Sequence, residues 1–228
     1  MNTIRPIRFA ASFLVLASCG STSSPAQKAD ASAEDIAQDA NPYGKAYPSK
    51  GFGTSAHSGS LAGGVFQNFR FYGHPNGDAS KGMQPLSMAK FFDPEMRAYK
   101  IVVLTATAPW CTYCKKETTE IIAARNTFSD RKIGVIQVVV ESQSSGIGAT
   151  QVDFDNWVRV LDHNFDVALD ESKRNLGAFV QAGGLPYALV LDARTMEILY
   201  SGVGAPANVE TAFDRYVSWV DSNPPTAY

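Results

Sequence analysis

The sequence is poor in cysteine, in charge of one sign and in long apolar runs. It holds three cysteines in 228 residues, and its 20 Lys and Arg nearly balance its 22 Asp and Glu. No basic run marks a surface for nucleic acid, so we expect no such partner. No apolar run approaches the roughly 20 residues that a membrane-spanning helix needs. So few cysteines also exclude a framework of several disulfides.

The first residues have the composition of an export signal. Two arginines precede a short apolar run over residues 9–17, which is the order of a positive segment and an apolar segment in such signals. The next residues, LASC at 16–19, resemble the lipobox of bacterial lipoproteins, in which the cysteine is lipidated and becomes the mature N-terminus. We therefore expect a lipoprotein signal peptide over residues 1–18 and a lipid on Cys19. An ordinary cleaved signal is the alternative.

The segment that follows is rich in Ser, Ala, Asp and Pro and poor in large apolar residues. Such a segment cannot bury enough surface to offset the entropy of ordering it, so we expect a flexible tether over residues 19–50. One domain remains, over residues 60–225, and it is long enough for its own core. The lipid on Cys19 would hold this domain at a membrane. Gly20 stands where some bacteria place the aspartate that retains lipoproteins in the inner membrane, which favours the outer membrane.

Alternating strand and helix patterns predict an α/β domain. Short β-branched apolar runs at 100–108 and 132–141 suit strands buried on both faces of a parallel sheet. Residues 187–202 contain two apolar strands joined by a turn, a C-terminal antiparallel hairpin. Residues 64–73 alternate large apolar and polar side chains and predict an N-terminal β extension. Helical patterns that would cover the sheet lie at 115–128, 153–164 and 171–184 and around 209–220.

Cys111 and Cys114 come directly after the first buried strand and open a helical segment. A zinc site needs four ligands, but no second cysteine pair is present and the histidines are scattered, so we expect no metal. A structural disulfide across two residues would remove little unfolded-state entropy. A redox pair suits the position, because the N–H groups and the dipole at a helix N-terminus stabilise a thiolate. Cys111 is thus the predicted nucleophile and Cys114 the resolving thiol.

The segments APWCTYCKKE and GGLPYALVLD together resemble the thioredoxin fold family. The resemblance implies a three-layer α/β/α sandwich with a mixed sheet, and it implies no cofactor. It also implies a cis-proline at Pro186 opposite the cysteines, which would leave the backbone of Leu185 free to pair with an extended substrate. The residues expected to support the active site and bind substrate are Trp110, Thr112, Tyr113, Leu185 and Pro186.

The chain is more specifically similar to the membrane-anchored, TlpA-like thiol-disulfide oxidoreductases of the bacterial envelope. The signal, the tether and the region around residues 64–92 carry this likeness. Three features depart from the family pattern, and one is Leu185 before the proline, which is bulkier than the residue in many relatives and bears on partner choice. Thr105 stands where thioredoxins carry a buried acid, and Glu141 is a candidate substitute. Thr112 and Tyr113 replace Gly-Pro or Glu-Pro between the cysteines, which leaves the direction of electron flow open.

Three functions are compatible with this sequence. The first is a lipid-anchored thiol-disulfide oxidoreductase on the periplasmic side of the cell envelope. It would reduce cysteine-containing exported proteins with electrons from an upstream donor. The second is a peroxiredoxin-like thiol peroxidase, but Ala108 and Leu104 stand where that class needs a threonine and a proline. The third is a non-enzymatic copper-binding or scaffold lipoprotein on the same fold, for which the cysteine spacing does not fit.

Overall fold

The structure is a computed structural model that describes residues 41–48, 63–180 and 184–223. The chain divides into two units, residues 1–31 and 32–228, and every described residue belongs to the second. The expected signal peptide, the lipidation site Cys19 and most of the tether lie outside the described residues. No helix found in the described part has the length and apolar character needed to cross a membrane.

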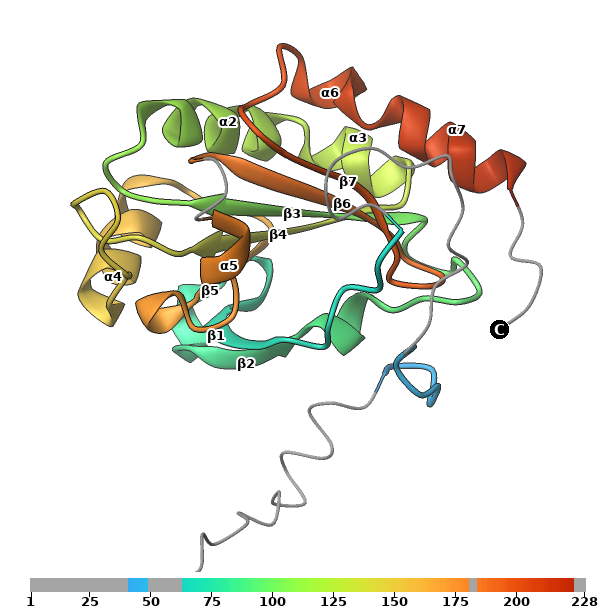
Figure 1. Cartoon of the computed structure of the whole chain (residues 1–228), viewed down its shortest axis with the longest axis horizontal. Coiled ribbons are helices and arrows are strands. Elements are labelled where there is room, and N and C mark those ends of the chain that lie inside the picture. Colours follow the sequence, from blue (N-terminus) through green and yellow to red (C-terminus); the bar gives the residue numbers. More distant parts are fainter. Residues whose placement is uncertain (1–40, 49–62, 181–183, 224–228) are drawn as a thin grey trace, which may run out of the picture. The chain divides into compact units, whose positions relative to one another are not determined.

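A seven-stranded mixed sheet forms the centre of the second unit, in the order β2-β1-β5-β4-β3-β6-β7. The three central strands β3, β4 and β5 are parallel (Figure 1). On the other side of β3, β6 pairs antiparallel with β3, and β7 pairs antiparallel with β6 to form the hairpin. An antiparallel pair, β1 and β2, extends the sheet beyond β5. The strands span Arg70–His74 (β1), Gln84–Ser87 (β2), Ile101–Thr107 (β3), Ile133–Val139 (β4), Asp166–Leu169 (β5), Tyr187–Asp192 (β6) and Ile198–Val203 (β7).

Helices cover both faces of this sheet, as the α/β/α prediction requires. On one face pack the helices α2, α3, α4, α6 and α7, and on the other lie η3, α5 and the N-terminal segment. The predicted mixed sheet, C-terminal hairpin and N-terminal β extension are therefore confirmed. The helices of the first face are α2 (Thr112–Ala123), α3 (Arg125–Asp130), α4 (Gln151–Val160), α6 (Val209–Ala212) and α7 (Asp214–Ser222); those of the second are η3 (Met88–Phe91) and α5 (Gly177–Val180).

Strand β3 shows why its sequence is an unbroken apolar run. All seven of its residues are buried. Val102 and Leu104 point into the core under η3 and α5, whereas Ile101 and Val103 point into the core under α2, α3 and α7. Full burial of such a side chain stabilises a fold by about 1.5–3 kcal/mol, so a strand apolar on both faces is fixed firmly at the centre. The carboxyl end of this rigid strand leads directly to the cysteines.

Only the last part of the N-terminal β extension predicted over residues 64–73 is a strand, because β1 begins at Arg70. Residues 63–66 hydrogen-bond along residues 196–198 at the start of β7. The chain then crosses one face of the sheet and forms β1, which pairs with β5 on the opposite side. Phe66 and Phe69 pack edge to face during this crossing, with ring centroids 5.2 Å apart. The aromatic side chains of this segment therefore cover a face of the sheet, and residues 63–69 do not form a strand continuous with β1.

The region after β5 also differs from its prediction. Residues 171–184 have a helical pattern, but in the described part of this range, residues 171–180 and 184, two short helices form, η4 (Glu171–Lys173) and α5. Ser172 and Lys173 have φ values of 58° and 56°. Positive φ is uncommon for residues other than glycine and interrupts a right-handed helix, so the helical pattern breaks at this point.

Candidate active site

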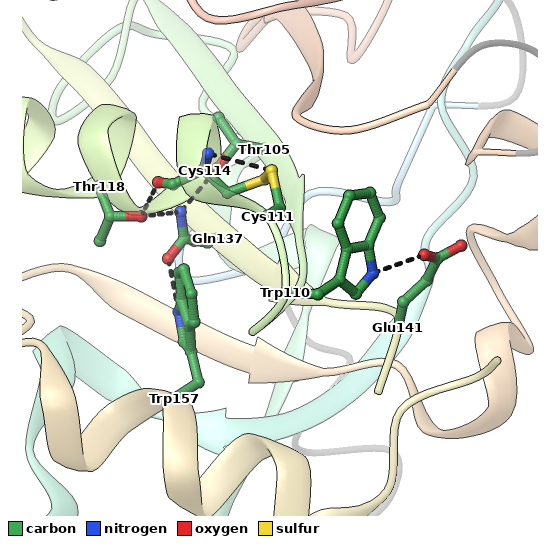
Figure 2. Close-up of a disulfide and its surroundings, with 8 residues drawn as sticks. All are labelled: Thr105, Trp110, Cys111, Cys114, Thr118, Gln137, Glu141 and Trp157. Atoms are coloured by element: carbon green, nitrogen blue, oxygen red, sulfur yellow. Dashed lines mark hydrogen bonds between the residues drawn. A yellow bond between two sulfur atoms is a disulfide. The ribbon is translucent and has the colours of Figure 1, made fainter. Parts of the chain in front are cut away.

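Cys111 and Cys114 form a disulfide at the junction between β3 and α2, with an S–S distance of 2.06 Å. Cys111 is the N-cap of α2, and its Sγ accepts a hydrogen bond of 3.1 Å from the backbone N–H of Cys114 (Figure 2). A donor aimed at sulfur favours the thiolate over the thiol once the bond is reduced. Both residues are buried, Cys111 at 2% exposure and Cys114 at 0%. The geometry therefore suits Cys111 as the charged thiol and Cys114 as the shielded one.

The other residues predicted for the site differ in how closely they approach the disulfide. Trp110 and Tyr113 flank it and are 37% and 71% exposed, and Thr112 between the cysteines is exposed as well. Leu185 packs against the same buried cluster that contains both cysteines. The peptide bond between Leu185 and Pro186 is cis, and Pro186 is buried. The structure thus gathers these predicted side chains around the cysteines. Cys19 lies outside the described residues.

A buried polar network lies beneath the disulfide, and the amide of Gln137 is its centre. Gln137 pairs with Thr105 across β4 and β3. Its Nε2 donates to the hydroxyls of Thr105 (3.3 Å) and Thr118 (2.8 Å), and its Oε1 accepts from Trp157 Nε1 (3.0 Å). Thr118 in turn donates to the carbonyl oxygen of Cys114 at 2.8 Å. The threonine found in place of an acid is therefore part of a network that joins α4 to the first turn of α2 (Figure 2).

We expect Gln137→Leu to lower the free energy of unfolding by about 2–3 kcal/mol, because it leaves the buried indole N–H of Trp157 without an acceptor. Urea unfolding measures this cost. Trp157→Phe is the matched reference, since it removes that donor. When Gln137→Leu is introduced into the Trp157→Phe variant, the loss of unfolding free energy should be smaller by about 1 kcal/mol than in the wild type. Equal costs in both backgrounds would show that the Trp157 hydrogen bond contributes nothing.

Glu117 is a buried acid that sequence reasoning missed. It lies on α2, one turn after Cys114, and both side chains are on the buried face of the helix. Glu117 is 1% exposed, and its Oε2 has no hydrogen-bond partner among the described residues. Burial, with a smaller contribution from the nearby charge of Glu120, raises the pKa of Glu117 to about 8. The signal in the sequence is its spacing of three from Cys114, which places both side chains on one face of the helix.

Glu141, the substitute acid suggested by the sequence, has a different environment. It forms a 2.5 Å ion pair with Lys173 and accepts hydrogen bonds from Trp110 Nε1 and from the backbone N–H of Gly146. Burial alone would raise the pKa of Glu141, but these bonds outweigh burial and lower it. Glu141 therefore stays ionised near neutral pH, and Glu117 is the better candidate for holding a proton beside Cys114.

Across residues 41–48, 63–180 and 184–223 no group of three or more His, Cys, Asp or Glu side chains could hold a metal ion. His163 is buried beside the Gln137 network, with its Nε2 3.3 Å from Gln137 Oε1, and burial lowers its pKa to about 4.

The chain has a thioredoxin-like fold with a cysteine pair at disulfide distance. A family model described as the AhpC/TSA family matches residues 80–198, so the chain belongs to that family. No curated protein matches the chain.

Three solved structures with the same fold illustrate the relationship. A protein of Chlorobium tepidum described as a thiol:disulfide interchange protein DsbE is 15% identical, with a TM-score of 0.52 over 68% of this chain and 94% of its own. The thioredoxin domain of a Bacteroides vulgatus thiol-disulfide oxidoreductase is 16% identical, with a TM-score of 0.50 over 70% and 99%. The exposed lipoprotein thioredoxin of Streptococcus pneumoniae is 19% identical, with a TM-score of 0.51 over 67% and 99%.

Proposed function

We propose that this protein is a thiol-disulfide oxidoreductase that reduces disulfides in cysteine-containing proteins. The observation that carries the proposal is the Cys111–Cys114 disulfide at the N-terminus of α2, where Cys111 Sγ receives a backbone N–H. In the reduced protein the Cys111 thiolate attacks a partner disulfide, forms a mixed disulfide and releases one partner thiolate. Cys114 then attacks Cys111 Sγ, which re-forms the internal disulfide and releases the second partner thiolate. Two electrons pass to the partner in each cycle.

Glu117 supplies the proton transfer that this cycle needs. Cys114 is fully buried, so its sulfur cannot readily exchange a proton with water. Side chains three residues apart lie on the same helix face with their Cβ atoms about 5–6 Å apart. The Glu117 carboxylate accepts the Cys114 proton before attack, and the protonated acid returns it when a donor reduces the disulfide. A pKa near neutrality is the most useful value for such a group.

We further propose that the protein works in the bacterial cell envelope, as a lipoprotein of the TlpA-like kind. The short apolar run over residues 9–17 and the sequence ending at Cys19 support this. A lipid on Cys19 and a tether over residues 19–50 would hold the domain over residues 60–225 on the periplasmic side. Gly20 favours the outer membrane. The partners would be exported proteins with cysteines and an upstream electron donor.

A redox titration in dithiothreitol buffers, with insulin reduction measured alongside, tests the proposed activity. We expect one two-electron transition that involves both cysteines, and catalytic reduction of insulin. In the reduced protein Cys111 should react with iodoacetamide below neutral pH and faster than Cys114. Rapid consumption of hydrogen peroxide with a sulfenic acid on Cys111, and no insulin reduction, would instead support a thiol peroxidase. Stoichiometric copper binding without turnover would support a binding protein.

A further inference from the structure

Lys173 lies far along the chain from the cysteines but is joined to the residue that precedes them. Its Nζ donates to Glu141 Oε1 at 2.5 Å, and Glu141 Oε2 accepts from Trp110 Nε1 at 3.0 Å. The ion pair is largely shielded, because the side chains are 12% and 6% exposed. A shielded pair of this kind holds its geometry better than an exposed one, which is weakened by solvent and salt.

The same two side chains also fix the loop that follows β4. Gly146 donates its N–H to Glu141 Oε2 at 3.0 Å and offers its carbonyl to Lys173 Nζ at 2.9 Å. One carboxylate oxygen therefore binds both the indole of Trp110 and the backbone of Gly146, which places these two nitrogens within about 6 Å of each other. Ile147, the next residue, is 60% exposed. Trp110, next to Cys111, and the loop that carries Ile147 are thus bound to the same carboxylate oxygen.

The backbone around Lys173 is arranged to bring its side chain to this place. Ser172 and Lys173 both adopt positive φ, and the N–H of Ser172 donates to the carbonyl of Ala149 at 3.0 Å. A Cβ added to Gly148 would lie 2.6 Å from Ser172 Cα, so this glycine permits the close approach of the two segments. An uncommon backbone conformation is tolerated only where the surrounding structure holds it in place. Here the positive φ values place the side chain of Lys173 against the loop that contains Gly146.

We propose that Lys173 is a positioning residue for disulfide exchange with polypeptide partners. Through Glu141 it fixes Trp110 and the Gly146–Ile147 turn as a single apolar surface that contacts the partner chain next to its disulfide. This inference rests on the proposed oxidoreductase function. A polypeptide disulfide extends across that surface, whereas a small disulfide such as hydroxyethyl disulfide reaches only the sulfur of Cys111. Replacement of Lys173 should therefore weaken the reaction with a polypeptide disulfide and leave the reaction with hydroxyethyl disulfide nearly unchanged.

The test compares Lys173→Met with Lys173→Arg and the wild type, using insulin and hydroxyethyl disulfide as substrates. Both replacements have unbranched side chains, which limits the change in cost of the positive φ. We expect Lys173→Met to raise KM for insulin roughly fivefold, about the effect of one ordinary hydrogen bond, with kcat and the rate on hydroxyethyl disulfide within about twofold. Lys173→Arg should restore most of the loss. Lys81→Met removes an exposed lysine and is the control for net charge.

An NMR signal reports the positioning without any turnover. The indole N–H of Trp110, assigned from its loss in Trp110→Phe, should shift in Lys173→Met while that of Trp157 stays in place. If Lys173→Met does not fold, Glu141→Gln, which removes the ion pair but keeps an acceptor for Trp110, should show the same selective rise in KM. An unmoved Trp110 signal, or equal losses on both substrates, would overturn the inference. A wild-type protein that reduces neither disulfide would overturn the proposed function itself.

Discussion

Cys114→Ser should convert the protein from a catalyst into a trap that keeps its partner covalently bound. Cys111 can still attack a partner disulfide, but no second thiol remains to release the mixed disulfide. Turnover should fall roughly a thousandfold or more, the scale expected when an essential nucleophile is removed. Cys111→Ser should lose turnover to the same extent and form no adduct, because Cys114 is fully buried on the inner face of α2.

To measure this difference, each reduced variant is incubated with oxidised insulin. Non-reducing gels and intact mass spectrometry then detect the mixed disulfide. Thr119→Ser, on the exposed side of α2, is the control and should keep wild-type turnover. The order of attack assigned here would be reversed if Cys111→Ser formed the adduct and Cys114→Ser did not. Full turnover by either single variant would exclude a dithiol mechanism.

Glu117→Gln should have the second-largest effect, because it removes a buried group that titrates near neutral pH. The carboxyl has an ordinary pKa of 4.5 and a pKa of about 8 in the folded protein. Because the folded value is raised, the stabilisation from the bound proton is full below pH 4.5 and is lost as pH rises through about 8. The wild type should therefore lose on the order of 3 kcal/mol between pH 6 and pH 9 from this group, and the variant should not.

Urea unfolding of the oxidised protein at several pH values measures the effect. Glu120→Gln is the matched control, since its side chain is partly exposed and pairs with Lys116, and it should leave most of the fall in place. The variant should also be reduced at least about tenfold more slowly by dithiothreitol at pH 7, because the acid that protonates Cys114 is gone. Parallel pH curves for wild type and Glu117→Gln would show that Glu117 does not carry a proton.

The sequence allowed the sheet and the cysteine pair to be predicted, because both depend on local patterns. The β-branched run of β3 has to be a buried strand, and the cysteines follow directly on it. Glu117 and Gln137 could not be found in this way. Each is a polar residue in an ordinary helix or strand pattern, and only the packing of α2 and α4 on the sheet buries it. The position of Lys173 depends on two positive φ values that no helical periodicity reveals.

The path of the N-terminal segment has a consequence for the order in which the chain can reach its final state. Residues 63–66 bond to residues 196–198, and β1 bonds to β5. The part of the domain that leaves the ribosome first therefore depends on partners that leave it late. Until residues 196–198 and β5 have been synthesised, Phe66 and Phe71 cannot pack into a complete core, and the N-terminal segment stays unpaired. A chain in that condition exposes apolar residues and strand edges, which are the features that chaperones bind.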